Sequence, residues 1–265
     1  MVVLAAMNDV QAVDAARECI YRYLTAAIAG PESSLWPSLF VSEATWAVRE
    51  ALVCLAELGS GSGFAEAEGG ERLDALRHLV DVLGASPYEA ADEYMRLFGL
   101  VVPSDCPPFE TEYMPASESF ARTQHMADAA GFYAAFGIRP SVDRRLRADA
   151  LELQLEFMAF LLAKKRMAAE GASHEGAEQG VVCDEAARAF FKDHLVWWIP
   201  AFVHGLERAS DGVFLKSLAG ALGAFIDLER ARFGIPRAQR HVRPESIEPR
   251  DEDSSCGTCP LNTTT

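Results

Sequence analysis

The sequence lacks any long apolar run. None of its 265 residues belongs to a stretch of 18 or more uncharged apolar residues, which is the length that a membrane-spanning helix requires. Residues 1–6 are too short and too poor in Lys and Arg to form a secretory signal. We therefore expect a cytoplasmic protein without stable membrane insertion.

Positive charge is also scarce. Lys and Arg total 24 against 39 Asp and Glu, which gives a formal net charge of -15. Nucleic acid and anionic membrane surfaces attract basic proteins, so both are poor candidate partners here. The acidity fits a basic ligand, and it equally fits a role in solubility alone.

Standard catalytic motifs are missing. The chain has no phosphate-binding glycine loop, no dinucleotide fingerprint, no His-Glu-x-x-His and no Gly-x-Ser-x-Gly. The six histidines form no metal-binding pair with carboxylates at helical spacing, so we expect them to be structural. The sequence therefore favours a binding protein without a cofactor over an enzyme.

The six cysteines form no disulfide framework, because only Cys256 and Cys259 are close in sequence. These two thiols could bind one zinc ion or one iron–sulfur cluster. They supply only half of a site, which Cys106, His241 or a second protomer would have to complete. A solvated, reduced tail and a redox dithiol are the alternatives.

No segment alternates β-branched and polar residues over the length of a strand, whereas half of the residues are apolar. We therefore expect an all-α fold: one helical domain over residues 1–236 with long connecting loops, and a disordered tail over 237–265. Glycines predict flexible linkers at 59–70 and 171–180, and four prolines predict a long ordered loop at 100–117. Apolar periodicity and end signals predict helices at 9–29, 42–58, 87–98, 118–136, 143–170, 183–210 and 212–233.

Two of these helices carry sharper signals. Ser86 and Glu89 form a capping box around Pro87, which predicts the start of the third helix. Pro200 predicts a break in the helix at 183–210, next to Trp197 and Trp198. We expect both tryptophans to lie in the core.

The loop at 107–113, PPFETEY, combines a rigid proline start with two aromatic rings and two carboxylates. It could form the mouth of a binding groove. It could equally be a buried crossing loop whose aromatic rings pack in the core while its carboxylates cap helices. The residues alone leave both interpretations open.

Three ordered segments resemble the TorD/DmsD/NarJ family of molybdoenzyme assembly chaperones. They are residues 107–113 (PPFETEY), 126–137 (MADAAGFYAAFG) and 149–159 (DALELQLEFMA). The resemblance extends from about residue 88 to 233. Ala150 stands where the family usually has His, and Gln154 where it usually has Glu. A role that requires an imidazole next to Asp149 is therefore not implied for this chain.

The resemblance implies a helical bundle that binds the N-terminal, often twin-arginine, segment of an apo molybdenum oxidoreductase of the dimethyl-sulfoxide-reductase class and holds it until the cofactor is inserted. An acidic surface, carboxylates that can pair with guanidinium groups and an apolar groove suit such a peptide. The residues implied for peptide binding are Phe109, Glu110, Glu112, Tyr113 and Asp149.

Two other functions remain open from the sequence. The chain could be a metal- or cluster-carrying accessory protein that uses Cys256 and Cys259, with the bundle as a docking platform. It could also be a permanent structural subunit of an oxidoreductase, in which case it would be found in the mature enzyme.

Overall fold

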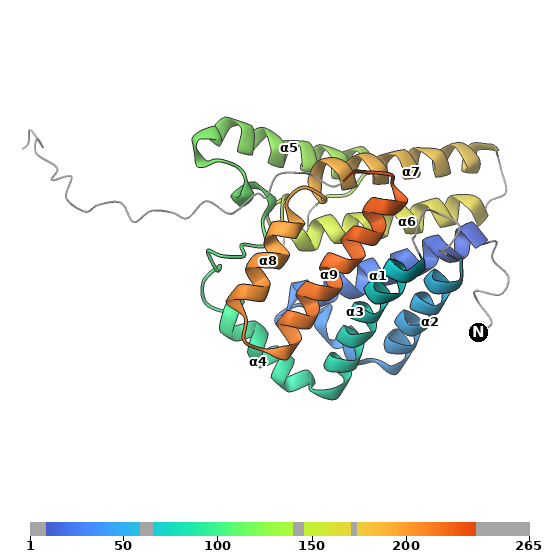
Figure 1. The fold of residues 1–265 in the computed structure, drawn as a ribbon. Helices are drawn as coiled ribbons and strands as arrows, with labels where there is room; N and C mark the ends of the chain where they lie inside the picture. Colours follow the sequence, from blue (N-terminus) through green and yellow to red (C-terminus); the bar gives the residue numbers. More distant parts are fainter. Residues whose placement is uncertain (1–8, 59–65, 140–145, 171–173, 237–265) are drawn as a thin grey trace, which may run out of the picture.

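α-Helices packed around an apolar core make up most of the chain that the computed structural model describes, which is residues 9–58, 66–139, 146–170 and 174–236 (Figure 1). Within these ranges the only β-type pairing is an isolated bridge, so the predicted all-α fold is confirmed. The helices are α1 (Asp9–Ala29), α2 (Ser42–Leu58), α3 (Glu66–Ala85), α4 (Pro87–Phe98), α5 (Ser119–Ala135), α6 (Leu151–Glu170), α7 (His174–His194), α8 (Ile199–Ala209) and α9 (Val213–Arg232). The shorter 3₁₀ turns are η2 (Trp36–Phe40), η4 (Glu110–Tyr113) and η5 (Ala116–Glu118).

The helices pack mainly as pairs. α1 lies against α6 on one side and α2 on the other, α7 covers α6, and α9 packs against α3 and α8 (Figure 1). Aromatic and aliphatic side chains from these helices form the buried core. α5 makes fewer contacts, chiefly with α7 and with the turns η4 and η5. This places α5 above the loop that carries the PPFETEY segment.

A buried ion cluster ties α1 to α9. The guanidinium of Arg17 donates to both oxygens of Glu229, at 2.7 and 2.6 Å, and to Asp14 at 2.9 Å. The hydroxyl of Tyr21 also donates to Glu229, at 2.9 Å. Arg17, Asp14 and Glu229 each expose 2% of their surface. Because the charges are paired and hydrogen-bonded, they can be buried without an uncompensated desolvation cost.

Most of the predicted helix ends are confirmed. Gly30 and Gly137 follow α1 and α5 with φ of 72° and 75°, the left-handed conformation that glycine adopts without strain. α7 ends at His194, and α8 begins at Ile199 with Pro200 in its first turn, so the predicted break is present. α4 begins at Pro87, but Ser86 makes no side-chain capping hydrogen bond.

Both predicted linkers are partly wrong. α3 was not among the predicted helices; it starts at Glu66 and runs through Gly69 and Gly70. α7 starts at His174, so residues 174–180 are helical. Glycine costs only about 1 kcal/mol in a helix interior, and packing against a neighbouring helix offsets this. Residues 59–65 and 171–173 lie outside the described ranges.

Two other expectations concern the start of α6 and the C-terminal tail. α6 starts at Leu151, eight residues later than predicted from 143, and Asp149 lies in the turn before it. The expected disordered tail at 237–265, with Cys256 and Cys259, lies outside the described residues.

None of the helices in the described ranges has both the length and the apolar character needed to cross a lipid bilayer.

Candidate functional site

The loop at 107–113 is fastened to the start of α6 by backbone pairing. Phe109 and Ala150 form an antiparallel bridge. The N–H of Glu110 donates to the carbonyl of Asp149, and the N–H of Leu151 donates to the carbonyl of Pro108, both at 3.0 Å. This pairing sets Glu110 and Asp149 side by side, although 39 positions separate them in the sequence.

Glu110 is the centre of a buried polar network. Its side chain is 0% exposed, and its carboxylate contacts four nitrogen atoms. On Oε1 these are His125 Nε2 at 2.6 Å and Trp197 Nε1 at 2.8 Å. On Oε2 they are Gln154 Nε2 at 2.6 Å and His194 Nδ1 at 3.1 Å. The donors therefore satisfy both oxygens, which is what allows a carboxylate to be buried.

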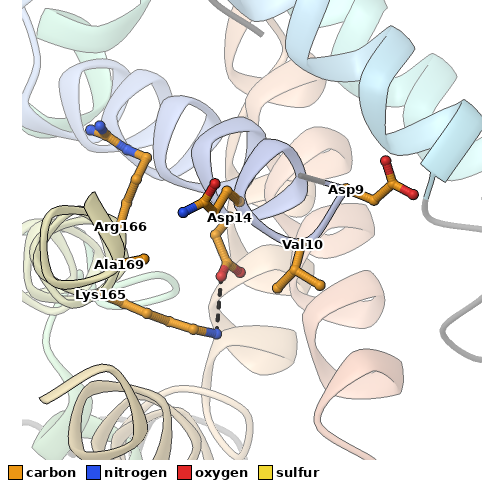
Figure 2. A pocket seen from close by; sticks show the side chains of 7 residues that line it. Asp9, Val10, Asp14, Lys165, Arg166 and Ala169 are labelled. Carbon is orange, nitrogen blue, oxygen red and sulfur yellow. Dashed lines mark ion pairs between the residues drawn. The ribbon is translucent and has the colours of Figure 1, made fainter. Parts of the chain in front are cut away.

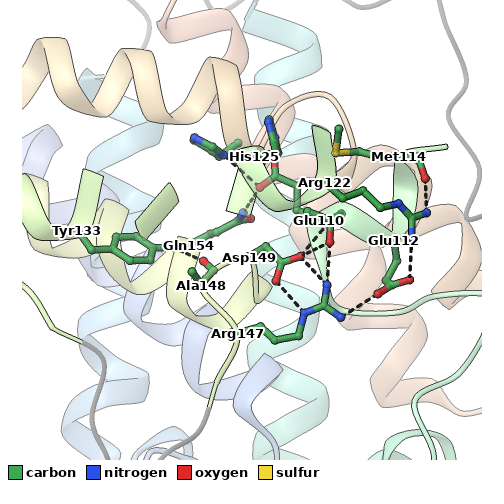
Figure 3. A network of polar contacts seen from close by, with 12 residues as sticks. Glu110, Glu112, Met114, Arg122, His125, Tyr133, Arg147, Ala148, Asp149 and Gln154 are labelled. Atoms are coloured by element: carbon green, nitrogen blue, oxygen red, sulfur yellow. Dashed lines mark hydrogen bonds and ion pairs between the residues drawn. The ribbon is translucent and has the colours of Figure 1, made fainter. Parts of the chain in front are cut away.

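Asp149 and Arg147 form the second part of the network (Figure 3). Arg147 donates from Nε and Nη2 to the two oxygens of Asp149, both at 2.9 Å. Its Nη1 donates to Glu112 at 2.8 Å, and its guanidinium lies over the ring of Phe109, 4.4 Å from the centroid. Thr111 donates to Asp149 from its backbone N–H and its hydroxyl.

These contacts shift the pKa values of two site residues. Burial alone would raise the pKa of Asp149, but the hydrogen bonds from Arg147 and Thr111 outweigh burial and lower the pKa below its usual value. The hydrogen bond to Glu110 raises the pKa of His125, against the opposing effect of partial burial. Both shifts favour the charged forms of Asp149 and His125.

The three segments that carry the family resemblance meet in this network. Glu110 comes from residues 107–113, Asp128 from 126–137 and Gln154 from 149–159. Gln154 contacts Glu110 directly, whereas Asp128 contacts His194 Nε2 at 3.2 Å, and His194 contacts Glu110. The resemblance therefore marks one place in the fold.

The structure brings all five predicted site residues together but exposes them unequally. Glu110 and Asp149 are 0% exposed, and Tyr113 is buried against the ring of Trp198. Phe109 and Glu112 are only partly buried. For Glu110, Asp149 and Tyr113 the interpretation as a buried crossing loop agrees with the geometry. Phe109 and Glu112 remain within reach of a partner.

Three members of the network, Arg147, His125 and His194, were not among the predicted site residues, and both histidines were expected to be structural. Helical spacing gave no signal for the histidines, since they are 69 positions apart and meet only in the folded chain. Arg147 lies two residues before Asp149, and this local pairing could have been noticed. The prediction that both tryptophans are core residues is confirmed for Trp198, whereas Trp197 is partly buried against the core and also donates to Glu110.

An open pocket of about 440 Å³ lies elsewhere, between the start of α1 and the end of α6 (Figure 2). Its charged lining includes Asp14, Lys165 and Arg166. Lys165 pairs with Asp14 at 2.9 Å, and Arg166 pairs with Glu18 at 3.2 Å. Because these charges are already paired, we assign no binding function to this pocket.

Comparison with known proteins gives two matches. The sequence model of a family described as nitrate reductase delta subunit matches residues 47–204, which include the whole network. The selenate reductase assembly chaperone protein of Thauera selenatis is 34% identical over 104 residues, which are 39% of this chain and 50% of the relative. The chain thus matches about half the length of that relative. No solved structure matches at a significant level. Because the family match spans more than half of the chain, the protein belongs to the nitrate reductase delta subunit family, the NarJ/TorD-like family of molybdoenzyme assembly chaperones.

Proposed function

We propose that this protein is a cytoplasmic chaperone that binds the N-terminal, twin-arginine segment of an apo molybdenum oxidoreductase of the dimethyl-sulfoxide-reductase class. In this proposal it holds the client until the cofactor is inserted and is then released. The observation that carries the proposal is the convergence of the three resembling segments on one network, inside the part of the chain that matches the family.

The charges around the network suit an arginine-containing peptide. Glu112 and Asp128 have side chains that are 35% and 64% exposed, so both can meet a partner from solvent. Asp128 can accept hydrogen bonds from a guanidinium group, and Glu112 can do so by sharing or exchanging the pair that it makes with Arg147. The net charge of -15 attracts a basic segment over a longer range. Phe109 adds a partly exposed ring for apolar contact.

We assign different tasks to the buried members of the predicted site. Glu110 and Asp149 already accept hydrogen bonds on both oxygens, so a client arginine could reach them only by displacing an internal donor. Tyr113 is packed in the core. In this proposal these three residues position the loop, while Glu112 and Phe109 touch the client.

A peptide-binding measurement tests this assignment. The probe is a synthetic peptide of the client's N-terminal segment, alongside the same peptide with both arginines changed to alanine. We expect Glu112→Arg to weaken binding of the arginine peptide at least tenfold and to leave the alanine peptide unaffected. The control is Glu57→Arg, an exposed carboxylate at the end of α2. Equal affinity of the two peptides for the unaltered protein would refute recognition of the arginines.

A further inference from the structure

Two histidines converge on the buried carboxylate of Glu110 from two different helices. His125 of α5 meets Oε1 through Nε2 at 2.6 Å, and His194 at the end of α7 meets Oε2 through Nδ1 at 3.1 Å. One ligand-type atom from each of the three side chains lies within 4.8 Å of the others. In this arrangement a single cation could contact both rings and the carboxylate.

The groups around these three side chains are those that support metal ligands. A histidine that binds a metal ordinarily donates its other ring N–H to a carboxylate or carbonyl, which fixes its tautomer. His194 Nε2 lies 3.2 Å from the carboxylate of Asp128. Trp197 and Gln154 donate to different oxygens of Glu110 and would keep the carboxylate oriented without the histidine protons.

We propose that Glu110, His125 and His194 bind one divalent transition-metal ion, of the class of Zn²⁺ or Co²⁺. The ion would replace the protons that now join the two imidazoles to the carboxylate. Imidazole nitrogen suits these ions, whereas Ca²⁺ and Mg²⁺ prefer sites made of oxygen alone.

The present distances allow this exchange with a small movement. Zinc bonds nitrogen at about 2.0–2.1 Å, so ligand atoms of a tetrahedral site lie roughly 3.3 Å apart. The contacts of 2.6 and 3.1 Å, which involve different oxygens of Glu110, must therefore open by less than about 1 Å, and the remaining ligand-atom separations, which lie within 4.8 Å, must close by at most about 1.5 Å. The side chain of His125 is 25% exposed, while those of Glu110 and His194 are 0% exposed. His125 thus provides both the freedom to move and the path from solvent.

The test is a titration of metal-free protein with Co²⁺, followed by the visible absorption that Co²⁺ shows in a tetrahedral site. The full chain is used with Cys256→Ser and Cys259→Ser, so that the two tail thiols cannot bind the ion. We expect one Co²⁺ per chain, no thiolate charge-transfer band, and competition by Zn²⁺.

Variants assign the ligands. We expect His125→Ala and Glu110→Gln to weaken Co²⁺ binding at least tenfold, and Asp128→Asn to weaken it on the order of tenfold through the orientation of His194. His174→Ala is the control, because that imidazole is 92% exposed on α7. If circular dichroism shows that Glu110→Gln does not fold, His125→Ala is the deciding variant, because the side chain of His125 is partly exposed.

Two results would overturn the proposal. One is the absence of bound Co²⁺ in the protein with both serines, which would leave Glu110, His125 and His194 as a network joined by protons alone. The other is unchanged Co²⁺ affinity in His125→Ala, which would place the ion elsewhere in the chain.

Discussion

Arg147 donates two hydrogen bonds to the carboxylate of Asp149, which is only two residues further along the chain and is 0% exposed. The same guanidinium pairs with Glu112 and covers the ring of Phe109. An arginine thus already pairs with Asp149 and Glu112, two of the three carboxylates that were predicted to bind a client's arginine. The loop at 107–113 can bind a guanidinium group, and in this structure that group belongs to Arg147 of the same chain.

The first prediction concerns this pairing. We expect Arg147→Ala to lower the free energy of unfolding by about 1–3 kcal/mol, because it leaves the buried Asp149 without its charged donor. The stability of Arg147→Lys should lie between those of the unaltered protein and Arg147→Ala, since lysine keeps the charge but lacks the planar guanidinium that donates two parallel hydrogen bonds. Urea unfolding measures both, with Arg139→Ala as an exposed control. A loss no larger than that of the control would show that the pair contributes nothing to the loop.

The buried ion cluster gives the second prediction. Arg17→Met should lower the free energy of unfolding by about 3–5 kcal/mol, because Glu229 would remain buried without the guanidinium that donates to both of its oxygens, while Asp14 would keep its pair with Lys165. Arg49→Met removes an ion pair with Asp81 whose side chains are 49% and 58% exposed, and it should cost at most about 1 kcal/mol. Thermal or urea unfolding of the two variants tests the contrast. Similar losses of unfolding free energy in Arg17→Met and Arg49→Met would contradict this prediction.

The third prediction concerns a close approach between the loop and α8. A Cβ atom on Gly205 would lie 2.1 Å from the carbonyl oxygen of Asp105 and 3.2 Å from Cβ of Cys106, so Gly205→Ala must push the loop away. We expect Gly205→Ala to lower the free energy of unfolding by about 1–3 kcal/mol. Gly220→Ala on α9 meets no atom within 4 Å and is the matched control, expected to be neutral or slightly stabilising.

Reaction of the Cys106 thiol reports on the same displacement. Burial raises the pKa of Cys106 to about 12, so the thiol should react slowly with alkylating reagents in the native protein. Gly205→Ala should speed that reaction, and Gly220→Ala should not. Equal labelling rates, read by mass spectrometry of the Cys106 peptide, would show that the loop tolerates the added methyl group.

The fourth prediction tests a cap that joins α4 to α9. The carboxylate of Glu93 accepts hydrogen bonds from the N–H groups of Val213 and Leu215 at 3.0 and 3.2 Å. Because the first N–H groups of a helix have no partner within the helix, Glu93→Ala should cost about 0.5–2 kcal/mol. Asp92→Ala, an exposed neighbour on α4, should cost less. An equal cost for both would rule out the cap.

Local signals in the sequence were enough to predict most helices but not their partners. Gly30, Gly137 and Pro200 act on the chain next to them, so their effects could be predicted from residue type. Glycine was misleading at 69–70 and 176–180, because these residues belong to α3 and α7, and the packing of those helices against α9 and α6 outweighs the low helical propensity of single glycines.

The site could be predicted only in part for the same reason. The motif segments indicated Glu110 and Asp149, but neither their burial nor their donors follow from spacing. His125, His194 and Trp197 reach Glu110 from α5, the end of α7 and the turn before α8, and that meeting depends on how the helices pack. The cap made by Glu93 was missed because it, too, joins distant helices.

The most direct test of the chaperone function is a pull-down with the tagged protein from anaerobically grown source cells. Bound chains are identified by mass spectrometry, and molybdenum in the eluate is measured. We predict recovery of the catalytic subunit of a molybdenum oxidoreductase without its molybdenum. Recovery of only the mature, molybdenum-containing enzyme would instead indicate a permanent structural subunit, and recovery of no molybdoenzyme chain would contradict the chaperone function.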